Sequence, residues 1–179
     1  MEYAIGHLFN RGGFGYLKKN SMAFNNMAKA CPVLLLTDLD RRPCPPDLLD
    51  EWLKGRKHQD FLLRVAVREV EAWLLATDEA LQRFLRVRRE FRFSDPESLD
   101  DPKRELLKLA ECSSNREVRS ALVRRDRSGT LRQGPAYNST LIDFVRKVWQ
   151  PSDASKRCRS LERATNALAE LESNWKTRE

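Results

Sequence analysis

The stretch VLLLTDLD at residues 33–40 decides how the first half of this chain is interpreted. Its apolar run has no polar alternation, which is typical of a strand buried inside a parallel sheet. Two carboxylates, Asp38 and Asp40, follow that run directly. Because ligands of open parallel sheets lie beyond the carboxyl ends of the strands, these two residues are the first candidates for a functional site.

A second strand pattern, FLLRVAV at residues 61–67, continues directly into the helical pattern REVEAWLLA at residues 68–76. A further strand is predicted at residues 3–9, and helices are predicted at residues 16–30 and 46–54. This alternation predicts an α/β fold over residues 1–90, with a parallel sheet and helices on its faces.

The second half of the chain, residues 91–179, lacks a convincing strand pattern and is predicted to be an all-α region packed on the α/β core. The pattern changes near residue 90 without a flexible linker. Helices are expected at residues 78–86, 103–112, 115–123, 139–149 and 159–173, with a loop at 94–102 and a link at 129–138.

Composition excludes several classes of protein. The 179 residues are 41% hydrophobic and 33% charged, which argues against a disordered chain, and no apolar run approaches the ~20 residues of a membrane-spanning helix. The start of the chain shows no secretory signal pattern. Four scattered cysteines without a CxxC motif are typical of reduced thiols, so a cytoplasmic protein is expected.

The net charge of +7 is concentrated in the second half of the chain, and residues 116–132 alone contain six arginines against two acids. Arginine suits bidentate phosphate contacts, so nucleic acid is an expected partner. Candidate contacts in this region are Arg124, Arg125 and Arg127. The alternative is a solvated helical surface with local ion pairs.

The two aspartates predict a site for a hard divalent cation, Mg²⁺ or Mn²⁺, because adjacent carboxylates repel each other unless a cation is present. Glu69 and Glu71 follow the next strand and are expected at the same edge of the sheet, where they would complete an oxygen-rich site. The alternatives are that Asp38 caps a turn, that Asp40 pairs with Arg41 or Arg42, and that the glutamates cap a helix.

Three further features are candidates for phosphate contacts. A glycine turn, GGFG at residues 12–15, precedes Lys18 and Lys19, but it matches neither the GxGxxG nor the GxxxxGK[ST] motif and is explained equally by a tight turn. Arg68 opens the pattern that contains the glutamates. Lys103, beside the predicted cap Asp101, could reach a scissile phosphate or be a surface lysine. Tyr137 and Asn138, in the link, could face the site or serve only a turn.

Several of these stretches resemble an uncharacterised bacterial family of Toprim-like proteins, often encoded beside AAA-type ATPases in mobile or phage-defence regions. The resemblance extends over nearly the whole chain, and the segments that carry it are GGFGYLKKN at 12–20, AFNN at 23–26, LTDLDR at 36–41, CPP at 44–46, AVREVEAWLLA at 66–76, DPK at 101–103, GPAYN at 134–138 and SLERA at 160–164.

The resemblance implies a Toprim-like fold, which occurs in topoisomerases, primases and overcoming-lysogenization-defect nucleases. Such folds cut or join phosphodiesters with Mg²⁺, held by a glutamate after the first strand and a DxD pair after a later one. Asp38 and Asp40 would be that pair, and Glu71, with Glu69, would support them. Longer relatives carry an additional strand with the motif glutamate before the segment matching residues 3–9. Its absence would leave a sheet edge open for a homodimer.

The leading hypothesis is therefore a Mg²⁺-dependent nucleic-acid phosphodiesterase, a nuclease that is the effector partner of an ATPase. Its metal would be held by Asp38, Asp40 and Glu71. The alternative is a catalytically degenerate Toprim-like adaptor that binds an ATPase or nucleic acid, which the missing first-strand glutamate favours. Nucleotide binding at the glycine turn is a third alternative. The sequence does not predict whether Met1 is the natural start of the chain.

Overall fold

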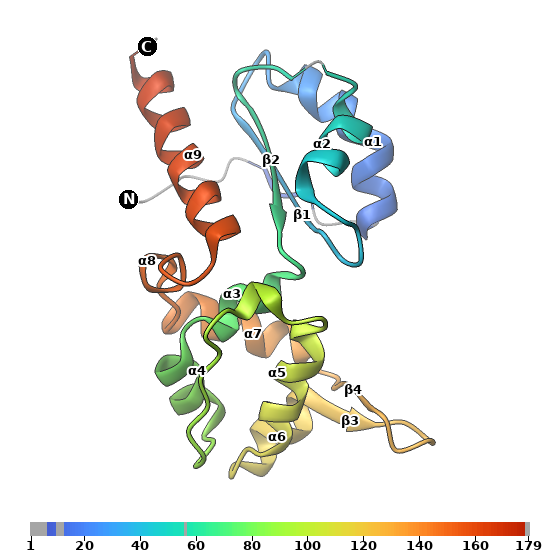
Figure 1. The fold of residues 1–179 in the computed structure, drawn as a ribbon, viewed down its shortest axis with the longest axis vertical. Coiled ribbons are helices and arrows are strands. Elements are labelled where there is room, and N and C mark those ends of the chain that lie inside the picture. Colours follow the sequence, from blue (N-terminus) through green and yellow to red (C-terminus); the bar gives the residue numbers. More distant parts are fainter. Residues whose placement is uncertain (1–6, 10–12, 56, 178–179) are drawn as a thin grey trace. The chain divides into compact units, whose positions relative to one another are not determined.

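The computed structural model describes residues 7–9, 13–55 and 57–177, and the chain divides into two compact units (Figure 1). The first unit contains described residues up to Thr37 and from Arg42 to Arg64. The second contains residues 38–41 and those from Val65 onward. The change of pattern near residue 90 falls inside the second unit. The strand expected at residues 3–9 and the start of the glycine turn lie largely outside the described residues.

The first unit combines a two-stranded parallel sheet with flanking helices. Its elements are α1 (Gly13–Met27), β1 (Val33–Asp38), α2 (Pro45–Leu53) and β2 (Phe61–Ala66). The hydroxyl of Ser21 on α1 donates a hydrogen bond of 2.9 Å to the carbonyl of Trp52 on α2, and the Phe14 ring packs edge-on against the indole. Pro45 begins α2 because its fixed φ suits the first turn of a helix.

Strand β1 is buried on one face only, although its apolar run predicted burial on both. Val33 and Leu35 are buried, whereas Leu34 and Leu36 are 48% and 39% exposed. Burial therefore alternates along β1 as it does in a strand with one covered face, while β2 is almost continuously buried.

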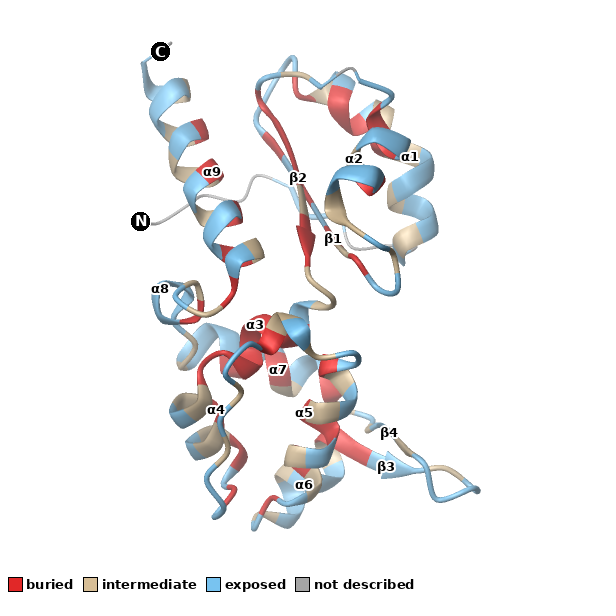
Figure 2. Ribbon diagram, viewed as in Figure 1, coloured by how far each residue is buried: buried red, intermediate tan, exposed pale blue. Residues whose placement is uncertain are grey.

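The second unit is mainly helical. Its helices are α3 (Val70–Leu75), α4 (Asp78–Leu85), α5 (Pro102–Glu111), α6 (Arg116–Leu122), α7 (Tyr137–Lys147), α8 (Pro151–Ala154) and α9 (Arg159–Lys176), with a 3₁₀ turn η1 (Pro96–Ser98). Buried residues of α3 to α7 form one core, in which the largest members include Leu81, Leu85, Leu106, Leu122 and Phe144, and buried residues of α3, α8 and α9 form a second cluster. Figure 2 colours the buried residues along these helices. This burial supplies the main stabilisation of the unit.

The expectation of an all-α second half is wrong over residues 123–133, which form an antiparallel hairpin of β3 (Val123–Arg125) and β4 (Leu131–Gln133). Each strand has only three residues, too few to show alternation in the sequence. A carboxylate closes the turn, because Oδ1 of Asp126 accepts hydrogen bonds from the backbone N–H groups of Ser128 and Thr130. Gly129 supplies the positive φ of 80° that the turn requires.

A glycine also fixes how the hairpin returns to the helices. The N–H of Gly134 donates to the carbonyl of Leu122 at 2.8 Å, and a side chain at position 134 would place its Cβ 2.4 Å from the carbonyl oxygen of Ala121. No larger residue can make this approach without displacing backbone. Helix α7 then begins at Tyr137, earlier than predicted, so Tyr137 lies in the helix and not in a turn.

Side-chain caps begin two neighbouring helices of the second unit, α5 and α6. The carboxylate of Asp101 accepts a hydrogen bond of 2.8 Å from the N–H of Arg104, so Asp101 caps α5 as expected. Asn115 caps α6 in the same way.

Among the described residues, no helix is long and apolar enough to cross a membrane.

Candidate functional site

The candidate site lies in the second unit, where residues 38–41 meet the segment that leads into α3. The backbone joins the two segments, because the N–H of Leu39 donates to the carbonyl of Ala66 and the N–H of Asp40 donates to the carbonyl of Arg68, both at 2.9 Å. The N–H of Val70, in the first turn of α3, donates to Oδ1 of Asp38 at 2.9 Å. The residues after the two strands are therefore held side by side.

Lys103 supplies the positive charge of the site. Its ammonium nitrogen lies 3.0 Å from Oε1 of Glu69 and 3.6 Å from Oε1 of Glu71. Its backbone N–H also donates to Oε2 of Glu69 at 2.9 Å, so Glu69 holds both ends of this lysine. Burial lowers the pKa of the ammonium, but the charges of Glu71 and Glu69 and the hydrogen bond to Glu69 outweigh burial, and the pKa lies above its ordinary value.

Glu71 is the most enclosed acid of the site, with 4% of its surface exposed. The hydroxyl of Tyr137 donates a hydrogen bond of 2.9 Å to its Oε1. Burial, together with the negative charge of Glu71, raises the pKa of Tyr137 far above its ordinary value, so the phenol stays protonated. The second oxygen of Glu71, Oε2, is buried without a hydrogen-bond partner in the structure. A buried carboxylate oxygen in this state is one that a bound cation or water would satisfy.

The charge of Asp38 is disfavoured by its surroundings. The pKa of Asp38 is raised from 3.8 to about 6, and burial is the main cause; the hydrogen bond from Val70 lowers it, and the nearby charge of Glu71 raises it. The charge of Lys103 lowers it in turn. Asp38 and Glu71 are thus close enough to interact electrostatically, and Lys103 interacts with both carboxylates.

Asp40 is placed differently from Asp38. It is exposed, adopts a left-handed backbone conformation with φ of 53°, and raises the pKa of Asp38 less than Glu71 does. Its carbonyl accepts a hydrogen bond of 3.3 Å from the guanidinium of Arg68. Arg68 therefore anchors the turn after β1.

The remaining predicted phosphate contacts lie in two places. Lys18 and Lys19 are exposed on α1 of the first unit, and the ammonium of Lys18 is paired with Glu51. Arg124, Arg125 and Arg127 are exposed on the hairpin of the second unit. Within the second unit, Arg124 lines the same hollow as Lys103.

The donor set limits how a metal could be held. Over the described part of the chain, no three or more histidine, cysteine, aspartate and glutamate side chains are grouped to hold a metal ion. The acids nearest one another are instead arranged around Lys103. Mg²⁺, however, is usually bound by one or two carboxylates and completes its coordination with water and substrate phosphate. Asp38 and the unpartnered oxygen of Glu71 are chemically suited to that mode.

Comparison with protein families, curated proteins and solved structures found no match to this chain. The fold is a mixed α/β one, and the site is a carboxylate cluster with one lysine and one tyrosine. From the sequence, Tyr137 has either a site-facing or a turn role, and Arg132 is only one member of the basic stretch 116–132. In the structure, Tyr137 on α7 contacts Glu71, and Arg132 on β4 lines the same hollow as Lys103. These contacts join segments that are distant in the chain, so no local pattern could have indicated them.

Proposed function

We propose that this chain is a Mg²⁺-dependent phosphodiesterase that acts on nucleic acid. The observation that carries the proposal is the proximity of two carboxylates, the partly buried Asp38 and the buried Glu71, to each other, to the Lys103 ammonium group and to an arginine-lined hollow. Asp38 and Glu71 would hold the metal, which when bound supplies Lewis-acid activation of water and charge stabilisation on a phosphate.

The side chains around that pair have separable roles. Tyr137 orients Glu71 through Oε1, which leaves Oε2 as the oxygen for a ligand. Glu69 positions Lys103 by accepting from its backbone and its ammonium group. Lys103 would bind a non-bridging oxygen of the substrate phosphate, since an ammonium group near a reacting phosphate stabilises the charge that develops there. Asp40 would support the site from its exposed turn.

The broader part of the proposal rests on the family resemblance. It includes a Toprim-like fold, a cytoplasmic protein, an AAA-type ATPase partner in phage defence and a homodimer. The parallel β1–β2 pair with flanking helices is compatible with that fold class, as is the DxD pair that begins at the last residue of β1.

The test is cleavage of labelled single-stranded DNA, duplex DNA and RNA by the purified chain, with Mg²⁺, with Mn²⁺ and with a chelator. We expect cleavage to require the metal and to be lost in Asp38→Asn and Glu71→Gln. Asp143→Asn, which removes an exposed acid of α7, is the matched control and should retain activity. Metal-dependent cleavage by Asp38→Asn, with a circular dichroism spectrum like that of the wild type, would contradict the assignment.

A second candidate is the adaptor function, in which the cluster has a structural role only. The observation in its favour is that Lys103 already pairs with Glu69 and Glu71, while Tyr137 completes the network. Calorimetry separates the two proposals. Mg²⁺ binding that disappears in the Asp38→Ala/Asp40→Ala variant supports the phosphodiesterase, whereas no binding by the wild type, with nucleic-acid binding intact, supports the adaptor.

A further inference from the structure

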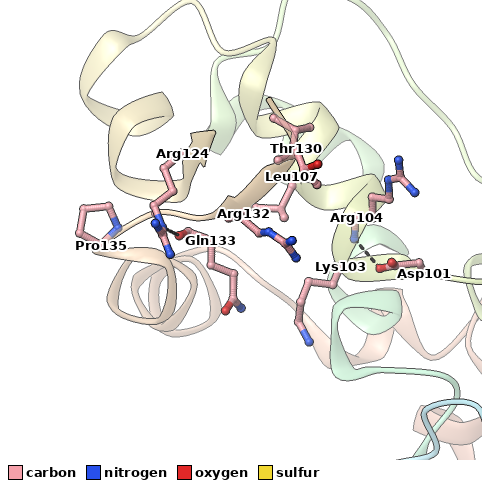
Figure 3. A pocket seen from close by; sticks show the side chains of 11 residues that line it. Asp101, Lys103, Arg104, Leu107, Arg124, Thr130, Arg132, Gln133 and Pro135 are labelled. Carbon is pink, nitrogen blue, oxygen red and sulfur yellow. Dashed lines mark hydrogen bonds between the residues drawn. The ribbon is translucent and has the colours of Figure 1, made fainter. Parts of the chain in front are cut away.

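An open hollow of ≈ 830 Å³ lies between helix α5 and the β3–β4 hairpin, within the second unit (Figure 3). Helix α5 contributes Lys103 and Arg104, and the hairpin contributes Arg124, Arg132 and Gln133. In Figure 3 the side chains of Lys103 and Arg132 extend into the space between these two elements. The volume is within the range of ligand-binding pockets, roughly 300–1,000 Å³.

The described lining of the hollow contains more basic than acidic side chains. Its four basic side chains face a single acid among the described lining residues, Asp101, and that carboxylate already caps α5. Two of the arginines are held in place: Nε of Arg124 donates to the carbonyl of Gln133 at 3.0 Å, and Nε of Arg132 donates to Asp126 at 2.9 Å. Fixed guanidinium groups recognise phosphate with less loss of side-chain entropy than mobile ones.

Lys103 connects the hollow to the candidate site. Its side chain lines the hollow, and its ammonium nitrogen lies 3.0 Å from Glu69 and 3.6 Å from Glu71. A polyanion bound along Arg132 and Arg124 would therefore extend to the lysine that borders the acids.

We infer that this hollow binds the sugar–phosphate backbone of a single-stranded nucleic acid and leads one phosphodiester to Lys103, a role that rests on the proposed function. A flexible strand can follow a concave surface of this size, whereas a duplex is stiff over about 150 base pairs. None of the described lining residues is aromatic, so base stacking does not contribute. Binding through phosphates alone is independent of sequence and weakens steeply with salt.

The test is fluorescence anisotropy with a labelled oligodeoxythymidine of about 12 nucleotides, within the site sizes of single-strand binders. The experiment is made in chelator, so that binding is measured without cleavage. We expect Arg132→Gln and Arg104→Gln each to weaken binding about fivefold or more, and to reduce the slope of log K against log salt by about 0.7 for each lost contact. Arg104 is an independent variant because it lies outside the hairpin.

Arg146→Gln is the matched control. Arg146 is exposed near the end of α7 and does not line the hollow, so its loss should change the affinity by less than twofold, roughly the effect of one distant screened charge. An equal loss for Arg146→Gln and Arg132→Gln would overturn the inference in favour of diffuse surface charge. Competition by duplex DNA or by polyglutamate as effective as that by the single strand would also overturn it.

The same variants separate this inference from the proposed function. Single-strand binding that depends on Arg132, without metal-dependent cleavage, would support the hollow and contradict the phosphodiesterase. Cleavage that is lost in Asp38→Asn but unchanged in Arg104→Gln and Arg132→Gln would support the phosphodiesterase and contradict the hollow.

Discussion

The hydroxyl of Tyr137 donates a hydrogen bond of 2.9 Å to Oε1 of Glu71, a residue 66 positions earlier in the chain. Both side chains are buried, so this bond joins the first turn of α7 to the first turn of α3 inside the second unit. It fixes one oxygen of Glu71 and thereby decides which oxygen can accept a ligand.

Removing that hydroxyl should destabilise the second unit. We expect Tyr137→Phe to lower the free energy of unfolding by about 2 kcal/mol, because a buried carboxylate loses a hydrogen bond that water cannot replace. Urea denaturation followed by circular dichroism measures the change. Tyr16→Phe, at an exposed position of α1, should be neutral. Equal stability of Tyr137→Phe and the wild type would show that the bond contributes little.

The ion pairs of Lys103 should be energetically coupled to Glu71. Lys103→Met keeps the backbone hydrogen bond to Glu69 but leaves two enclosed carboxylates without their cation, and we expect a loss of about 2 kcal/mol, since the lysine is partly exposed. In the double variant Lys103→Met/Glu71→Gln, part of this loss should be recovered. Lys108→Met, which breaks a surface pair with Glu105, should cost less than about 0.5 kcal/mol. Additive losses in the double variant would argue against the coupling.

Asp38 should lower the stability of the protein at neutral pH. Its folded-state pKa of about 6 exceeds the ordinary value of 3.8, so ionisation is harder in the folded state than in the unfolded one. The difference corresponds to at most about 3 kcal/mol. This penalty is absent below about pH 3.8, grows as the pH rises through 6, and is complete above it.

The substitution Asp38→Asn removes the charge and keeps an oxygen to accept from Val70. We therefore expect the variant to be more stable than the wild type at about pH 8 and equal to it near pH 4. Unfolding in urea across this pH range measures the difference. A variant that is less stable than the wild type at about pH 8 would show that the carboxylate is stabilised in the folded state.

Gly134 should tolerate no side chain. In Gly134→Ala, the new Cβ would lie 2.4 Å from the carbonyl oxygen of Ala121, so the hairpin or α6 must shift, and we expect a loss of about 2 kcal/mol or more. The same change at Gly15, within α1 and with open space around it, should stabilise the helix by up to about 1 kcal/mol. Thermal unfolding of both variants measures these opposite changes in stability. An unchanged melting temperature for Gly134→Ala would mean that small backbone shifts relieve the close contact with Ala121.

The sequence predicted the elements whose signals are local. The apolar run of β1, the helical spacing of α5 and the cap at Asp101 depend on neighbouring residues, and the structure confirms them within a few positions. The hairpin was not predicted because each of its strands has only three residues, which is too short for a recognisable strand pattern. The turn that joins the strands depends on the carboxylate of Asp126 and on Gly129. The exposure of Leu34 was missed because an apolar run does not indicate how many of its faces are covered.

By itself, the sequence determined where the acids stand: Asp38 and Asp40 directly after a strand, and Glu69 and Glu71 at the start of the next helix, since apolar runs and helical periodicity mark both junctions. Only the tertiary structure decided which partners these acids receive. Lys103 and Tyr137 reach Glu71 from α5 and α7 because those helices bury their apolar faces in one core with α3. Packing of that kind depends on contacts between distant segments, and no local pattern encodes it.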